Sequence, residues 1–164
     1  MFLSHIYLDK TQFMALVKLF NDAGYGGYVY WIEDRQLNRS EVNLETTLTL
    51  RQRMEMSKGL AYLATSNITN SKSCPWELGY FDGKKNGRCC ILPVMDYTSF
   101  KGKEYLGIYP YIDYAKEKKS NKYEFWVNSP EENKYVKLRE WLKEKILIVI
   151  KNGGKLWDKK KLNI

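Results

Sequence analysis

Residues 71–83, SKSCPWELGYFDG, come directly after an apolar run at residues 60–65 and a polar loop. Ser73 or the cysteine that follows it is expected to cap a helix that begins with Pro75, because proline's missing N–H costs no hydrogen bond at the first helical position. Glu77 would then stand in the first helical turn, just past the end of a strand. Ligands of parallel α/β sheets bind at that edge, so Glu77 is a candidate site residue. A first-turn carboxylate can also simply cap the helix, and position alone leaves both interpretations open.

Strand patterns alternate with helix patterns along most of the chain. Strands are expected at residues 2–4, 28–32, 60–65, 88–94 and 105–111, with an edge strand or extended segment at residues 123–127. Helices are expected at residues 9–23, 45–58 and 75–83. Alternation of this kind, with short connections, favours an α/β fold with an open parallel sheet of five strands and helices on both faces.

Two helix starts carry capping signals. Asp9 and Gln12 resemble a capping box ahead of the first helix. The apolar face of that helix comprises Phe13, Leu16, Val17 and Phe20. Ser129 and Pro130 open a second pattern, SPEE, which predicts one long C-terminal helix over residues 129–152. We expect residues 1–164 to form a single domain on which this helix packs.

The composition is that of a globular protein with one domain. Of the 164 residues 44% are hydrophobic, and no apolar run reaches the length of a membrane span. Residues 1–20 lack the apolar centre of a signal peptide, since Asp9 and Lys10 interrupt it. The three cysteines and the single histidine show no metal-binding spacing, and the neighbours Cys89 and Cys90 should face opposite sides of the sheet. We expect a cytoplasmic protein in a reducing compartment, with no metal and no membrane partner.

The formal net charge of +8 raises nucleic acid or another anionic surface as a partner. The excess is concentrated in two late runs, residues 116–122 and 159–161. Such runs are more often solvated loops and tails than binding sites. No recognition helix and no aromatic–basic ribonucleoprotein motif accompanies them, so we do not expect nucleic-acid binding.

Several short motifs follow one another along residues 1–112. They are FLSH at residues 2–5, WIEDRQLNR at residues 31–39, ETTLTLRQRMEM at residues 45–56, PWELGYFDG at residues 75–83 and ILP at residues 91–93. Each motif is weak alone, but the set is specific and resembles the bacterial Toll/interleukin-1 receptor (TIR) family. The resemblance implies a flavodoxin-like TIR domain. It also implies a long loop at residues 33–43 that helps to form the site and the surfaces for TIR–TIR self-association.

The resemblance implies an enzyme that cleaves the nicotinamide–ribose bond of NAD⁺. Its products would be nicotinamide and either ADP-ribose or a cyclised ADP-ribose, which a separate effector protein would sense during defence against phage. The leaving group is already a pyridinium, so no general acid is needed to expel it. A nearby carboxylate stabilises the oxocarbenium-like charge that develops on the ribose, as in glycosidases. NAD⁺ is therefore expected as the substrate, and no cofactor is expected.

Glu77 matches the family's catalytic glutamate. The substrate-binding residues predicted around it are Ser4, His5, Trp31, Asp34, Arg35, Arg39 and Trp76. Competing interpretations remain open for this set. Ser4 could be an ordinary loop hydroxyl, His5 and Trp31 could be structural, and the arginines could be solvated. Trp76 could pack its helix on the sheet instead of stacking near nicotinamide.

Two departures from the family pattern concern the shape of the pocket. Ser73 stands where many relatives carry tryptophan, and Tyr30 stands where relatives often carry aspartate. Both favour a weak or partner-activated enzyme. The alternative function is a non-catalytic TIR adaptor that recruits other TIR proteins. A nucleotide-binding sensor of the receiver type is disfavoured, because the acidic pair expected after a first receiver strand is missing from residues 2–9.

Overall fold

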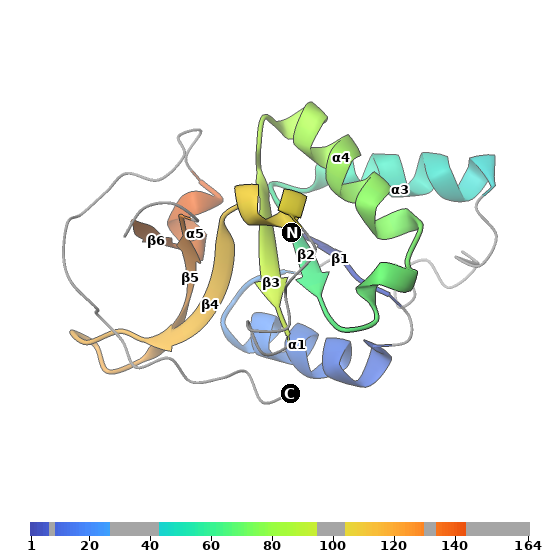
Figure 1. Cartoon of the computed structure of the whole chain (residues 1–164). Coiled ribbons are helices and arrows are strands. Elements are labelled where there is room, and N and C mark those ends of the chain that lie inside the picture. Colours follow the sequence, from blue (N-terminus) through green and yellow to red (C-terminus); the bar gives the residue numbers. More distant parts are fainter. Residues whose placement is uncertain (7–8, 27–42, 95–103, 130–133, 144–164) are drawn as a thin grey trace.

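A six-stranded sheet forms the centre of the molecule, in a computed structural model that describes residues 1–6, 9–26, 43–94, 104–129 and 134–143. The strands are β1 (Phe2–Ser4), β2 (Leu60–Ala64), β3 (Cys89–Pro93), β4 (Tyr111–Lys116), β5 (Tyr123–Asn128) and β6 (Tyr135–Lys137). They lie side by side in chain order (Figure 1). β1 to β4 pair in parallel, whereas β5 pairs antiparallel with both β4 and β6.

The end of the sheet that is formed by β4, β5 and β6 differs from the arrangement that the sequence predicts. The described residues hold six strands, more than the five expected, and β5 and β6 pair antiparallel. β5 confirms the additional strand expected at residues 123–127, but it pairs on both sides and does not lie at the edge of the sheet. Most of the segment expected as a strand at residues 105–111 is instead the 3-10 turn η4 (Glu104–Ile108), and β4 begins only after Pro110. Pro110 explains this offset, because it has no N–H for a sheet ladder. Its carbonyl accepts from Ile91 N at 2.8 Å where β4 joins β3. The strand expected at residues 28–32 lies outside the described residues.

Helices cover both faces of the sheet, as predicted. α1 (Lys10–Asp22) lies on one face, and α3 (Leu44–Met56) and α4 (Ser73–Lys85) lie on the other (Figure 1). Successive side chains of a strand point to opposite faces, and Cys89 and Cys90 divide in this way between the two cores. β2 is buried at every position, as expected of a parallel strand that is covered on both sides.

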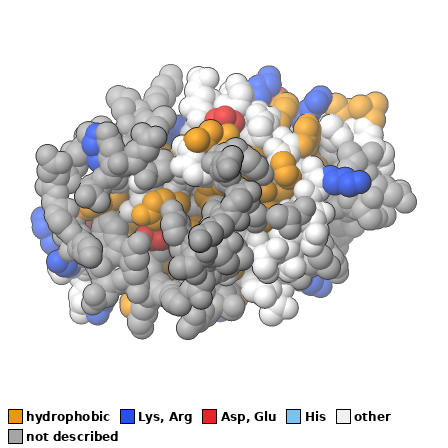
Figure 2. Space-filling model, viewed as in Figure 1, with side chains coloured by type: hydrophobic (Ala, Val, Ile, Leu, Met, Phe, Trp, Pro, Cys, Tyr) orange, Lys and Arg blue, Asp and Glu red, His pale blue; other side chains and the backbone are white. Residues whose placement is uncertain are grey.

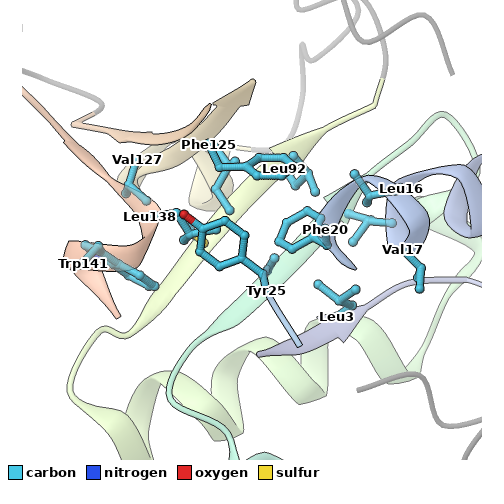
Figure 3. Close-up of a cluster of buried hydrophobic side chains, with 14 of the residues drawn as sticks. Leu3, Leu16, Val17, Phe20, Tyr25, Leu92, Phe125, Val127, Leu138 and Trp141 are labelled. Atoms are coloured by element: carbon cyan, nitrogen blue, oxygen red, sulfur yellow. The ribbon is translucent and has the colours of Figure 1, made fainter. Parts of the chain in front are cut away.

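The core on the α1 face joins distant parts of the chain. The apolar face predicted for α1 is buried there, with Phe13, Leu16, Val17 and Phe20. The ring of Phe20 lies 4.3 Å from that of Phe125 on β5, and Tyr25 meets Phe125 edge-on at 5.8 Å (Figure 3). Leu138 and Trp141, from the short helix α5 (Leu138–Trp141), complete the cluster. The antiparallel end of the sheet therefore shares one core with the parallel strands.

The long helix expected over residues 129–152 is wrong at residues 135–137. These residues form β6 and pair with β5. Ser129 N donates to the Lys134 carbonyl at 2.9 Å, which closes the connection between the two strands. Residues 144–164 lie outside the described part of the chain.

α3 begins at a capping residue, and the chain just after its end packs closely against α5. The Asn43 side chain caps it by accepting from Thr46 N at 2.8 Å. Gly59 follows the end of this helix and lies against α5, where a Cβ would approach the Trp141 ring to 2.8 Å. None of the helices in the described ranges is both long enough and apolar enough to cross a membrane.

Candidate active site

Glu77 lies further into α4 than the sequence predicts. The helix begins at Ser73, and the Ser71 hydroxyl accepts from Cys74 N at 3.1 Å in the role of a cap. Pro75 is thus the third helical residue. Its missing N–H still costs nothing there, because the first N–H groups of a helix have no partner within the helix. The first turn contains no acidic residue, so the interpretation of Glu77 as a helix cap is wrong.

The Glu77 carboxylate meets Ser4, the last residue of β1. The Ser4 hydroxyl donates to Glu77 Oε2 at 2.6 Å, and both residues have an exposed fraction of 0%. Because Ser4 ends a parallel strand, this pair lies at the carboxyl edge of the sheet, where α/β proteins bind ligands. Glutamate is seldom fully buried, and burial of a charged group is costly unless hydrogen bonds compensate for it. Fold stability alone does not require a glutamate at this position.

His5 lies on the opposite face of the sheet from this pair. Its ring stacks on Phe13 of α1 at 3.5 Å, and Nδ1 donates to the Leu3 carbonyl at 2.9 Å. The alternation of side chains along β1 causes the separation, since Ser4 points towards α4 and His5 towards α1. The structure therefore does not bring His5 to Ser4 and Glu77, and these contacts favour a structural role.

Trp76 is half-buried where α4 meets α3. Its ring lies 5.8 Å from that of Tyr80, and the Arg51 guanidinium of α3 lies 5.9 Å from the Trp76 centroid and 5.3 Å from the Tyr80 centroid. The Tyr80 hydroxyl donates to Glu55 at 2.9 Å. These contacts join α3 to α4 and favour the packing interpretation of Trp76 over a contact with nicotinamide. The other four candidates, Trp31, Asp34, Arg35 and Arg39, lie outside the described residues.

A second buried carboxylate, that of Asp9, lies at the same edge of the sheet, although the sequence predicted that it would cap α1. Asp9 is 3% exposed, and its side chain makes no capping bond to α1, so the predicted capping box is wrong. The carboxylate accepts instead from the Thr65 hydroxyl and, at 2.6 Å, from Asn67 Nδ2. Thr65 and Asn67 directly follow β2, and Asp9 follows β1. Polar residues placed after neighbouring parallel strands were the signal in the sequence that could have indicated this contact.

The cysteines act as core residues. Cys74, Cys89 and Cys90 are buried and form no disulfide. Burial raises the pKa of the Cys90 thiol well above its ordinary value, and burial together with the negative charge of Asp82 raises the pKa of the Cys89 thiol. These two thiols stay protonated near neutral pH and are poor nucleophiles. In the described part of the chain, no group of three or more His, Cys, Asp and Glu side chains could hold a metal ion.

The arrangement suits the stabilisation of positive charge. The sheet edge carries an anchored carboxylate, Glu77, whose orientation is set by the Ser4 hydroxyl. A carboxylate that is already in place in a site of low dielectric constant interacts strongly with a cationic centre, and it need not reorganise during a reaction.

Comparison with known proteins identifies relatives. No protein-family model matches the chain. The chain is 42% identical over 146 residues to a probable 3′ cyclic ADP-D-ribose synthase, ThsB′, of Bacillus cereus (strain MSX-D12), a match that covers 87% of this chain and 75% of the relative. It is also 32% identical over 80 residues to a putative cyclic ADP-D-ribose synthase, TIR2, of Cytobacillus dafuensis, a match that covers 48% of this chain and 21% of that protein.

The similarity to ThsB′ extends over most of both chains, and the parallel sheet with helices on both faces agrees with the TIR resemblance of the motifs. The chain therefore belongs to the TIR family of proteins related to the cyclic ADP-D-ribose synthase ThsB′.

Proposed function

We propose that the protein consumes NAD⁺, cleaves its nicotinamide–ribose bond and releases a cyclic ADP-ribose that acts as a signal in bacterial defence. The observation that carries the proposal is the buried Glu77 carboxylate, bonded to Ser4 at the carboxyl edge of the sheet. The names of the two relatives support the cyclic product over linear ADP-ribose. A separate effector protein would respond to that product.

The proposed reaction needs few catalytic groups. The bond between ribose C1′ and the pyridinium nitrogen breaks, and its electron pair leaves with nicotinamide as a neutral molecule. Glu77 stabilises the positive charge that this step leaves on the ribose. A hydroxyl group of the same ADP-ribose then attacks C1′ and loses its proton, which closes the ring; attack by water would give linear ADP-ribose instead.

Ser4 has a different role in this proposal from the one that the sequence predicts. Its hydroxyl proton is used in the bond to Glu77, so Ser4 orients the carboxylate instead of binding the substrate in the described arrangement. The Glu77 side chain is also fully buried. A ribose can reach it only if this edge of the sheet opens, which supports a partner-activated enzyme.

Self-association is the activating event that we propose. Three large apolar side chains of α3 are more than half exposed: Leu44 at 74%, Leu48 at 54% and Met56 at 71%. Hydrophobic side chains also lie on the surface over α3 and α4 in Figure 2. Leu44 and Leu48 are one helical turn apart and therefore share a face of α3. Exposed apolar side chains that lie together mark interaction surfaces, and we assign this one to a second copy of the chain. The same surface would serve the alternative function, a non-catalytic TIR adaptor.

The test of the proposed function is Glu77→Gln. Glutamine can still accept the hydrogen bond from Ser4, so unfolding free energy should fall by no more than about 1 kcal/mol. NAD⁺ cleavage should fall by roughly a hundredfold or more, because a neutral amide does not stabilise the cationic transition state. Rates are measured by separating nicotinamide and the ADP-ribose products by mass. Glu140→Gln, at an exposed position of α5, is the matched control and should cleave at the parent rate.

Two results would contradict the proposal in different ways. A folded Glu77→Gln protein with the parent rate would reject Glu77 as the catalytic residue. A parent protein that cleaves no NAD⁺, even when concentrated, would reject the enzyme in favour of the adaptor.

A further inference from the structure

We propose that Asp9 is a positioning residue of the active site, which ties together the two connections that carry Ser4 and Glu77. This inference rests on the proposed function and extends it to a residue outside the predicted site. The Asp9 side chain accepts hydrogen bonds from Thr65 and Asn67, and we assign it an indirect role through these two residues.

Both oxygens of the Asp9 carboxylate are engaged. Oδ2 accepts from the Thr65 hydroxyl, and Oδ1 accepts from Asn67 Nδ2 at 2.6 Å. Asp9 and Thr65 are 3% and 6% exposed, so water competes little for these bonds. Hydrogen bonds to an ionised acceptor are about twice as strong as those between neutral groups. These two hydrogen bonds, which we call the Asp9 bridge, thus form a strong link between segments that are far apart in the sequence.

The bridge and the Ser4–Glu77 bond connect the same two stretches of chain. The first stretch runs from Ser4, at the end of β1, to Asp9. The second runs from Thr65, at the end of β2, through the 3-10 turn η2 (Ile68–Asn70) to Glu77. Each stretch is therefore held to the other at two points, once at each end.

The second stretch is also stiffened along its length. Ser71 N donates to the Ile68 carbonyl at 3.1 Å, and the Ser71 hydroxyl accepts from Cys74 N at 3.1 Å. A displacement at Thr65 would therefore be transmitted into the first turn of α4, and so towards Glu77. A misplacement of about 1 Å in a catalytic group can cost on the order of a hundredfold in rate.

Local helix stability does not explain this use of Asp9. The residue occupies the N-cap position of α1, where an aspartate normally bonds to the second or third N–H of the helix and contributes about 1 kcal/mol. The Asp9 side chain makes no such bond and reaches across to the connection after β2 instead. The local capping interaction is forgone in favour of the long-range contact.

The test compares kcat and KM for NAD⁺ cleavage among variants that remain folded by circular dichroism. Asp9→Ala removes the bridge and should lower kcat by roughly ten- to a hundredfold, with little change in KM. Thr65→Val removes one bond while keeping the shape of the side chain, and should lower kcat by a smaller factor. Asp9→Asn should largely restore kcat, because its amide can accept from Asn67 and donate to the Thr65 hydroxyl.

The control is Asp22→Ala, which removes a carboxylate from the same helix. Asp22 pairs with Lys18 on the surface at 2.6 Å, with the two side chains 60% and 76% exposed, and its loss should leave kcat unchanged. Amide hydrogen exchange gives a second measurement that needs no turnover. Exchange should become faster over residues 65–77 in Asp9→Ala and stay unchanged in α3.

Each outcome decides a separate question. A folded Asp9→Ala protein with the parent kcat and parent exchange would overturn the positioning role, while the proposed function would stand. If Asp9→Asn were as impaired as Asp9→Ala, the negative charge itself would matter and the geometric role would be wrong. If Asp9→Ala did not fold, Thr65→Val would decide by the same measurements. Absence of NAD⁺ cleavage in the parent would reject the proposed function, and hydrogen exchange would still test the bridge.

Discussion

The Ser4 hydroxyl and the Glu77 carboxylate come from β1 and α4, far apart in the sequence, and meet out of contact with solvent. At the scale of single residues, this bond decides how the carboxylate is oriented. Both residues were predicted as site residues, but their direct contact was not, because sequence motifs carry no distances. The alternation of side chains along a strand does predict part of this arrangement. If Ser4 faces α4, the next residue, His5, must face the opposite side of the sheet, where α1 lies.

Ser4→Ala tests the orienting role. The substitution removes the donor and leaves Glu77 Oε2 without this hydrogen bond, so the unfolding free energy should fall by about 1.5–3 kcal/mol, the range for bonds to charged groups. kcat for NAD⁺ cleavage should fall roughly tenfold or more, because the carboxylate loses its fixed orientation. Urea denaturation and steady-state kinetics measure the two effects. Ser66→Ala, at an exposed loop position, should change neither, and a Ser4→Ala protein with parent stability and parent kcat would refute the role.

At the scale of elements, predictions succeeded where the apolar pattern was strong and local. The buried face of α1 and the buried strands β2 and β3 were predicted from period and composition, and the structure confirms them. The helix predicted over residues 129–152 failed because β6 depends on pairing with β5, a contact that no local signal announces. The start of α4 was misplaced because Ser71 provides the cap from outside the helix and lets Pro75 lie further in.

Gly59 shows how close packing between two elements can require glycine at a position. A Cβ at this position would lie 2.8 Å from Trp141 Cζ3 and 2.9 Å from Leu142 Cδ2, both in the α5 region. Gly59→Ala should therefore lower the unfolding free energy by about 1–3 kcal/mol through overpacking. Equilibrium denaturation measures the change.

The matched control for Gly59 is Gly79→Ala, within α4. A Cβ at Gly79 would meet nothing within 4 Å, and alanine is the better helix former, so stability should rise by about 0.5–1 kcal/mol. A Gly59→Ala protein as stable as the parent would show that α5 does not pack tightly on the segment before β2.

At the scale of the whole molecule, the buried carboxylate and the exposed apolar side chains of α3 both favour activation by a second copy of the chain. Glu77 is inaccessible in the single chain, and Leu44, Leu48 and Met56 are exposed. The net charge of +8 opposes association of identical chains at low salt, and counterions screen this repulsion. Neither property was evident from motifs, because the exposed fractions of Glu77 and of the α3 side chains depend on how the helices pack on the sheet.

Activity should therefore depend on protein concentration. If a second copy must contact α3 before the Glu77 edge opens, NAD⁺ cleavage per molecule should rise with protein concentration and level off once assembly is complete. Leu48→Glu should shift this rise to higher concentration, because it places a charge among exposed apolar side chains. Met14→Glu, at a 39% exposed position on α1, changes the net charge equally and should leave the curve in place. Cleavage assays paired with sedimentation velocity measure both quantities, and a specific activity that stays flat over a wide concentration range would establish a self-sufficient monomer.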